Sequence, residues 1–206
     1  MNKKVKDKNH QKLLTKIEKN IEIYLRNRFL NYKAETNYMP FQKAIVGERY
    51  RGIYSFTHSV STKLGMGVYE QTAKLIAQAS GMTQVDTQYK IPFSITSETD
   101  QKIHQIWQSM KREKKENNTK IISNEIKNFS AKGDASEDDE DRVVDFTFRD
   151  KKNNLYFIDI TSPKPNIKEF DALKLKLLRW IAIAHANYEF NDFKALLAMP
   201  YNPYYP

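Results

Sequence analysis

The stretch RVVDFTFRDKKNNLYFIDITSPKPN, residues 142–166, decides the fold. Residues 142–148 and 154–161 alternate in polarity and are rich in β-branched and aromatic side chains, and DKKNN between them has the composition of a turn. This pattern predicts a β-hairpin. Apolar residues recur at spacings of three and four after SPKPN, which predicts a helix from about residue 167.

The segments on either side of this hairpin predict an α/β (α+β) fold. Helices are expected at residues 13–30, 61–81, 98–115 and 121–130, an edge strand within 85–95, and a last strand at 193–200. Pro92 bars a central strand because it cannot donate to a ladder. The order of helices, then strand, turn, strand, helix and strand predicts a mixed β-sheet flanked by helices.

Two of the expected helices carry charged residues opposite an apolar stripe. In the helix at 61–81, Glu70 falls on the side opposite Val68 and Leu75, and Gly65 and Gly67 are expected to delay its start. In the helix after residue 167, the positions opposite the stripe are Lys168, Lys176 and Arg179. These charged residues are therefore expected to face away from the core.

The chain has 206 residues, of which 40% are hydrophobic, and this is enough for one compact domain. We expect a helical and irregular N-terminal part at 1–57 and a core at 58–206. The chain lacks cysteine, which excludes disulfides, thiolate nucleophiles and zinc ribbons. Its apolar runs are too short for a membrane helix, so a cytoplasmic protein that does not enter the membrane is expected.

The charge balance favours a polyanionic partner. Lysine and arginine number 34 against 25 acidic residues, and 34 − 25 gives a net charge of +9. Residues 1–28 alone hold nine basic and three acidic residues, a local charge of +6. A solvated helix face and a DNA-facing helix both agree with this charge.

Asp145 and Asp159 are the positions where chemistry is expected. They lie 14 residues apart on the two predicted strands, so a tight turn can bring both carboxylates to one face. Two like charges placed together favour a divalent cation between them, and Mg²⁺ prefers such oxygen ligands. Lys164 follows where the second strand ends, where its ammonium can contact a phosphate. Exposed or lysine-paired aspartates are the competing interpretation.

Three segments resemble the TdeIII-type type II restriction endonucleases, which belong to the PD-(D/E)XK nuclease superfamily. They are FIDITSPKPN at 157–166, STKLGMGVYEQTAKLIA at 61–77 and AMPYNPYYP at 198–206. The resemblance is spread over roughly residues 55–206. It implies a Mg²⁺-dependent enzyme that cuts double-stranded DNA at a short specific site, as a homodimer.

The resemblance also implies roles for individual residues. Asp145 matches the first acid of the motif and Asp159 the second, with Ile160 as a further metal ligand. Glu70 matches a supporting helix acid, although an ordinary salt bridge to Lys74 is an equal alternative. The remaining catalytic position departs from the family pattern.

Thr161 stands where the motif has a lysine. Either Lys164 supplies the missing charge, or Lys164 binds backbone phosphate and another lysine, or none, serves catalysis. The residues expected to bind DNA are Lys164, Asn166, Lys168, Tyr201 and Asn202, with Asn166 equally suited to cap the following helix. The competing functions are a non-catalytic DNA-binding protein on the same fold and a nuclease without sequence preference.

Overall fold

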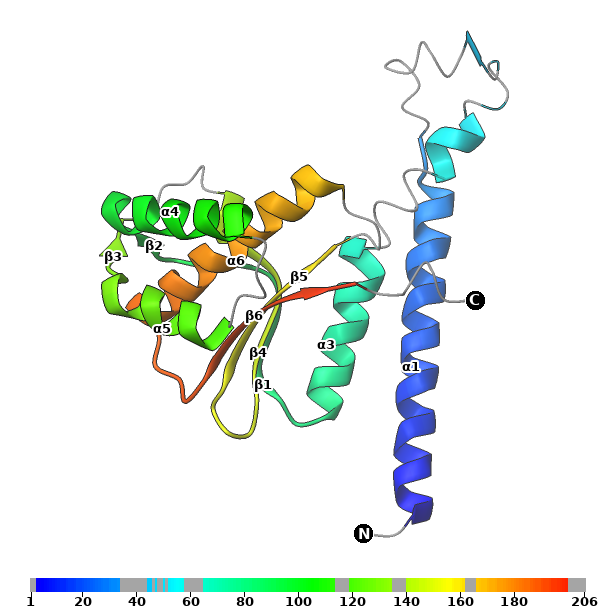
Figure 1. Cartoon of the computed structure of the whole chain (residues 1–206). Helices are drawn as coiled ribbons and strands as arrows, with labels where there is room; N and C mark the ends of the chain where they lie inside the picture. Colours follow the sequence, from blue (N-terminus) through cyan, green and yellow to red (C-terminus); the bar gives the residue numbers. More distant parts are fainter. Residues whose placement is uncertain are drawn as a thin grey trace. The chain divides into compact units, whose positions relative to one another are not determined.

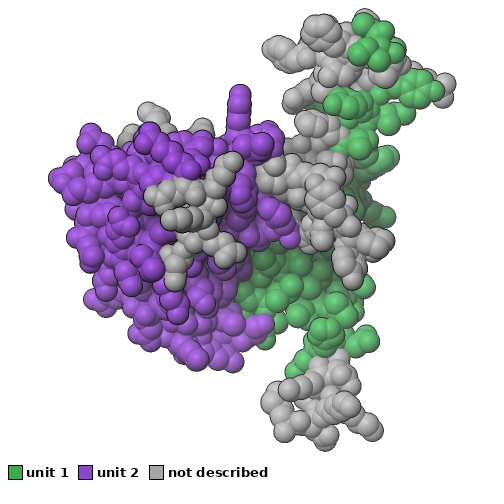
Figure 2. All heavy atoms as spheres, in the orientation of Figure 1, with its two compact units in different colours: residues 1–79 green, residues 80–206 purple. Residues whose placement is uncertain are grey.

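The computed structural model describes residues 3–33, 44–45, 47, 50, 52–57, 65–113, 119–134, 140–161 and 166–199. The chain divides into two compact units, residues 1–79 and 80–206 (Figure 2). This boundary lies later in the chain than the expected start of the core at residue 58. The expectation of a single domain stays a prediction.

The first unit is built on helix α1, Lys3–Leu30, which contacts the π-helical turn η1, Gly65–Tyr69, and helix α3, Glu70–Ala79. Helix α1 begins earlier than predicted because its first turns are rich in lysine and carry no apolar stripe that the periodicity could detect. Regular α-helix resumes only at Glu70, so the delay predicted from the two glycines is confirmed. A Cβ at Gly67 would lie 2.1 Å from the ring of Tyr24, so any other residue there would require this ring to move.

A four-stranded mixed sheet forms the centre of the second unit (Figure 1). Its strands, in spatial order, are β1 (Thr83–Lys90), β4 (Val143–Arg149), β5 (Leu155–Ile160) and β6 (Phe193–Ala198). The first three pair antiparallel, and β6 pairs parallel with β5. Strand β1 lies at an edge and ends before Pro92, as predicted, and the predicted fold class is confirmed.

A short second sheet and three helices complete this unit. The short strands are β2 (Ser94–Ile95) and β3 (Lys132–Gly133), and the helices are α4 (Ser97–Glu113), α5 (Thr119–Phe129) and α6 (Ile167–Asn187). A 3₁₀ turn, Glu140–Arg142, leads into β4. All three predicted helices of this region are present, with boundaries within a few residues of those expected.

Helix α6 lies between two hydrophobic clusters. On one side Trp180, Ile183 and Ala184 pack with Phe157 and other sheet residues. On the other side Leu178 and Ala182 pack with Ile103 of α4 and Ile126 of α5. The order of layers is therefore sheet, then α6, then α4 with α5.

Because α6 is covered on two sides, the prediction that its charged residues face away from the core is wrong for two of them. Lys176 and Arg179 are half-buried, and both form ion pairs inside the unit. The same correction applies to Glu70, which was expected opposite an apolar sector and is 2% exposed. Lys168 is exposed, as expected.

The first turn of α6 is fixed by a capping box. The side-chain oxygen of Asn166 accepts from the N–H of Glu169 at 3.0 Å, and the Glu169 carboxylate accepts from the N–H of Asn166 at 2.8 Å. This reciprocal pair satisfies two donors that an uncapped helix leaves unpaired. The predicted capping role of Asn166 is confirmed, and α6 begins at Ile167 as expected.

Candidate active site

The register of the hairpin sets two carboxylates near each other. Strands β4 and β5 pair Thr147 with Phe157 and Phe146 with Ile158. This pairing ends at Phe146 and Ile158, and Asp145 and Asp159 are the next residues on the two strands, close enough for the charge of Asp159 to act on Asp145. The turn therefore brings the two acids near each other, as the sequence predicts.

Asp145 is held from two directions. Its Oδ2 accepts from the main-chain N–H of Ile160 at 2.7 Å, and its Oδ1 accepts from Nε2 of Gln88 on β1 at 3.2 Å. Burial raises the pKa of Asp145, and the charge of Asp159 adds to this rise, while the N–H of Ile160 and the ammonium of Lys176 oppose it. The carboxylate is thus fixed in orientation but disfavoured in its charged form, a condition that a nearby cation relieves.

Asp159 is more deeply buried, with 5% of its surface exposed. Its Oδ1 accepts from Nζ of Lys176 at 2.5 Å, and the side chains of the two residues are 7% and 18% exposed. Nζ of Lys176 also lies 4.9 Å from the centre of the Trp180 ring, one turn further along α6. The ammonium is therefore held between a carboxylate and an aromatic face.

The carboxylate oxygens of this site are suitable ligands for a divalent cation such as Mg²⁺. Such an ion is bound in proteins by one or two carboxylates, with waters and substrate phosphate completing its shell. Asp145 and Asp159 offer carboxylate oxygens on adjacent strands, and their mutual repulsion favours an ion that both can bind. Among the residues that the structure describes, no group of three or more His, Cys, Asp or Glu is placed to hold a metal.

The other predicted site residues are placed as follows. Thr161 follows β5 and is half-buried, and its N–H donates to the carbonyl of Ala198 at 3.0 Å. Asn166 caps α6, and Lys168 lies exposed in its first turn. Glu70 belongs to the first unit, so its supporting role stays a prediction. Lys164, Tyr201 and Asn202 lie outside the described residues.

Sequence reasoning missed two partners of the aspartates, Lys176 and Gln88. Lys176 was placed opposite the apolar stripe of its helix, and such positions usually face solvent. The available signal was the apolar run that surrounds it, since Leu175 and Leu177 flank it on both sides. Gln88 gave no signal because nothing in its segment indicates that its side chain reaches Asp145.

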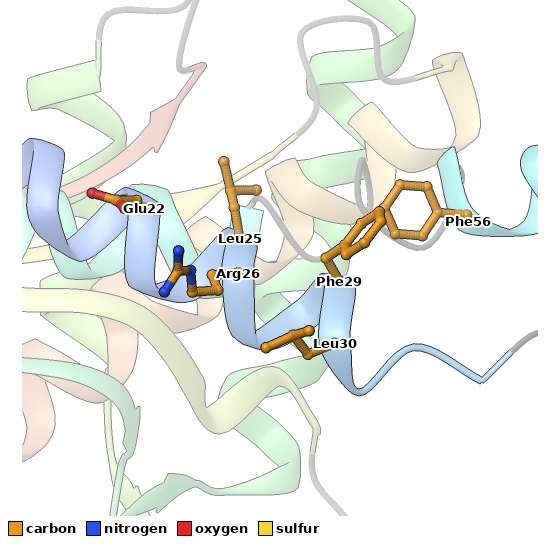
Figure 3. A pocket seen from close by; sticks show the side chains of 6 residues that line it. All are labelled: Glu22, Leu25, Arg26, Phe29, Leu30 and Phe56. Carbon is orange, nitrogen blue, oxygen red and sulfur yellow. The ribbon is translucent and has the colours of Figure 1, made fainter.

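A second feature, in the first unit, is an apolar pocket near the end of α1. It is lined by Glu22, Leu25, Arg26, Phe29, Leu30 and Phe56 (Figure 3). The rings of Phe29 and Phe56 pack edge to face with centroids 5.7 Å apart. This lining has little to offer a reaction, since Glu22 and Arg26 are its only charged members, so the aspartate pair remains the candidate site.

Comparison with known proteins gives one family. The profile described as type II restriction endonuclease, HinfI, matches residues 9–206, a span that includes the hairpin and both aspartates. No curated protein and no solved structure matches the chain. In the described part of the chain, no helix is long and apolar enough to cross a membrane.

Proposed function

We propose, for a chain that belongs to the HinfI family of type II restriction endonucleases, Mg²⁺-dependent hydrolysis of double-stranded DNA at a specific sequence. Membership of the family makes the protein a type II site-specific deoxyribonuclease. The finer parts are our proposal: Mg²⁺ as the metal, a homodimer as the active form, the cytoplasm as its location and likeness to the TdeIII type of these enzymes. SPKPN and the late MPYNP support that likeness.

The observation that carries the proposal is the pair of carboxylates on adjacent strands. Asp145 and Asp159 would hold the metal together with Ile160, which has only a main-chain oxygen to offer. A bound Mg²⁺ would supply the acidity that activates a water and the positive charge that stabilises the transition state at phosphorus. The N–H of Ile160 fixes the orientation of the Asp145 carboxylate, which would help it to bind the metal.

The remaining predicted residues would contact DNA. Asn166 caps α6 and Lys168 lies in its first turn, where the helix N-terminus and the lysine charge favour phosphate oxygens. Lys164, two residues before Asn166 in the sequence, would add a further positive charge. Tyr201 and Asn202 would reach bases or phosphates. The supporting role of Glu70 stays a prediction of the resemblance. Two copies related by a twofold axis would match the symmetry of a palindromic sequence.

The experiment is digestion of phage or plasmid DNA by the purified full chain, with Mg²⁺ and with EDTA. Asp159→Ala is compared with Glu125→Gln, which removes an exposed carboxylate from α5. We expect discrete fragments with Mg²⁺ for the wild type and for Glu125→Gln, and none for Asp159→Ala. Fragments that persist in Asp159→Ala refute the proposed site.

Thr161 gives one specific reason to test the rival function of a DNA-binding protein without activity. If that rival function is correct, the wild type binds specific DNA and metal but does not cleave DNA in Mg²⁺ or Mn²⁺. A smear without discrete bands instead identifies a nuclease without sequence preference.

A further inference from the structure

We propose that Lys176 is the cation of this site and replaces the lysine that the motif lacks at Thr161. This inference rests on the proposed function. The motif places its lysine two residues after the second acid, where alternation along a strand puts both side chains on one face. Here the ammonium comes instead from α6, and its Nζ lies 2.5 Å from Oδ1 of Asp159.

The ammonium of Lys176 is held in place by a buried residue of its own helix. Trp180 is fully buried, and its Nε1 donates to the carbonyl of Asp141 at 2.7 Å. The ring therefore offers a rigid face to Nζ of Lys176, 4.9 Å from its centre. A side chain held in this way loses little further freedom when substrate binds, which is the property required of a positioned catalytic group.

Charge counting gives Lys176 a role beyond pairing with Asp159. With both carboxylates ionised, Asp145, Asp159 and this ammonium sum to a charge of −1, which a divalent cation would change to +1. Without the ammonium the same site would be neutral after metal binding. A positive site stabilises the additional negative charge that develops on the phosphate in the transition state.

This assignment separates the roles of two lysines. Lys176 acts at the carboxylates, where its charge also reaches Asp145. Lys164 is then left with contact to the DNA backbone, so its loss weakens DNA binding and makes it less dependent on salt. The two variants are therefore expected to affect different kinetic constants, kcat for Lys176 and KM for Lys164.

The first test compares Lys176→Met with Lys174→Met, which removes an equal charge from the same helix. Nζ of Lys174 lies over the ring of Phe170 rather than beside an aspartate. We expect Lys176→Met to lower kcat by at least about a hundredfold, the range reported for one preorganised donor. The DNA affinity of Lys176→Met, and both the activity and the DNA affinity of Lys174→Met, should stay within about fivefold of the wild type, which is the size of effect expected from one weakly paired charge. Unchanged kcat in folded Lys176→Met overturns the proposal.

The second test moves the lysine. In the double variant Thr161→Lys with Lys176→Met, the new ammonium stands directly after the end of β5, two residues after Asp159, so cleavage should recover at least about tenfold over Lys176→Met. A structural role alone does not predict this recovery. If Lys176→Met does not fold, the double variant still carries a counterion, and a folded but inactive double variant overturns the proposal.

The third test does not need cleavage and so separates failure of this proposal from failure of the proposed function. Binding of Mn²⁺ alone is measured by calorimetry for the wild type, Lys176→Met and Asp159→Asn. Loss of an ammonium beside Asp159 should tighten Mn²⁺ binding by at least about tenfold, because like charges no longer compete there. Equal affinity in the wild type and Lys176→Met overturns the assignment of Lys176 whether or not the wild type cuts DNA.

Discussion

Replacement of Arg179 by methionine tests the ion-pair network that joins α4, α6 and the turn before β4. Nε and Nη2 of Arg179 donate to the two carboxylate oxygens of Asp100 at 2.7 and 3.1 Å, and Nη1 donates to Asp141. Methionine keeps most of the apolar stem and removes these three bonds, together with the contact of Nη2 with Nε2 of His104 at 3.2 Å. It also leaves two carboxylates without the charge that lies between them.

The expected loss follows from the number of bonds and from their exposure. A hydrogen bond to a charged group contributes about 1.5–3 kcal/mol when it is buried. Here the Arg179 side chain is 25% exposed and both aspartates are 33% exposed, so water screens part of the attraction. Halving three such bonds gives a loss of about 2–4 kcal/mol.

The assay is thermal unfolding at pH 7, followed by far-ultraviolet circular dichroism. For a chain of this length, about 3 °C per kcal/mol gives a decrease in Tm of roughly 6–12 °C. The matched control is Lys102→Met, which removes an exposed pair with Glu98 on α4 and should leave Tm unchanged. A decrease for Arg179→Met no larger than that of the control refutes the reasoning.

Three further changes test other parts of the second unit. Burial lowers the pKa of His185 below its value in the unfolded chain, so the stability present above about pH 6.5 is lost as the pH falls. The difference between the Tm at pH 8 and the Tm at pH 5 should therefore be smaller in His185→Gln than in the wild type. Burial raises the pKa of Asp145, so its ionised carboxylate destabilises the folded protein at neutral pH. Asp145→Asn should therefore have a higher Tm than the wild type at pH 7, and this difference should shrink towards pH 3. An equal Tm at pH 7 contradicts this prediction. A Cβ at Gly133 would lie 2.4 Å from the carbonyl oxygen of Ile95, so Gly133→Ala should lower the free energy of unfolding in urea by about 1–3 kcal/mol. The control is Gly52→Ala, which has open space around the new Cβ and should lower this free energy by less than about 0.5 kcal/mol.

The hairpin could be predicted from the sequence because its signals are local. Alternating strands, a polar turn and the fixed period of two together determine that Asp145 and Asp159 meet. The edge position of β1 followed from one proline, and the start of α6 followed from Asn166. In each case the deciding residues lie within a few positions of the feature that they determine.

The charged faces of the helices could not be predicted in the same way. A helical wheel gives the direction of each side chain but not the number of neighbours that cover the helix. Because α6 is enclosed by the sheet on one side and by α4 and α5 on the other, Lys176 and Arg179 meet acids from distant segments. Asp100 lies 79 positions before Arg179, a pairing that no local pattern contains.

The capping box at Asn166 fixes the rotational phase of α6. Each residue turns the helix by 100°, so one residue inserted or deleted between positions 166 and 176 would swing the Lys176 ammonium out of reach of Asp159. The length of this segment is then under a constraint that its composition does not reveal. Among related chains with threonine at the position of Thr161, we expect this spacing to be kept even where the intervening residues differ, so the functional signature is an interval rather than a string of letters.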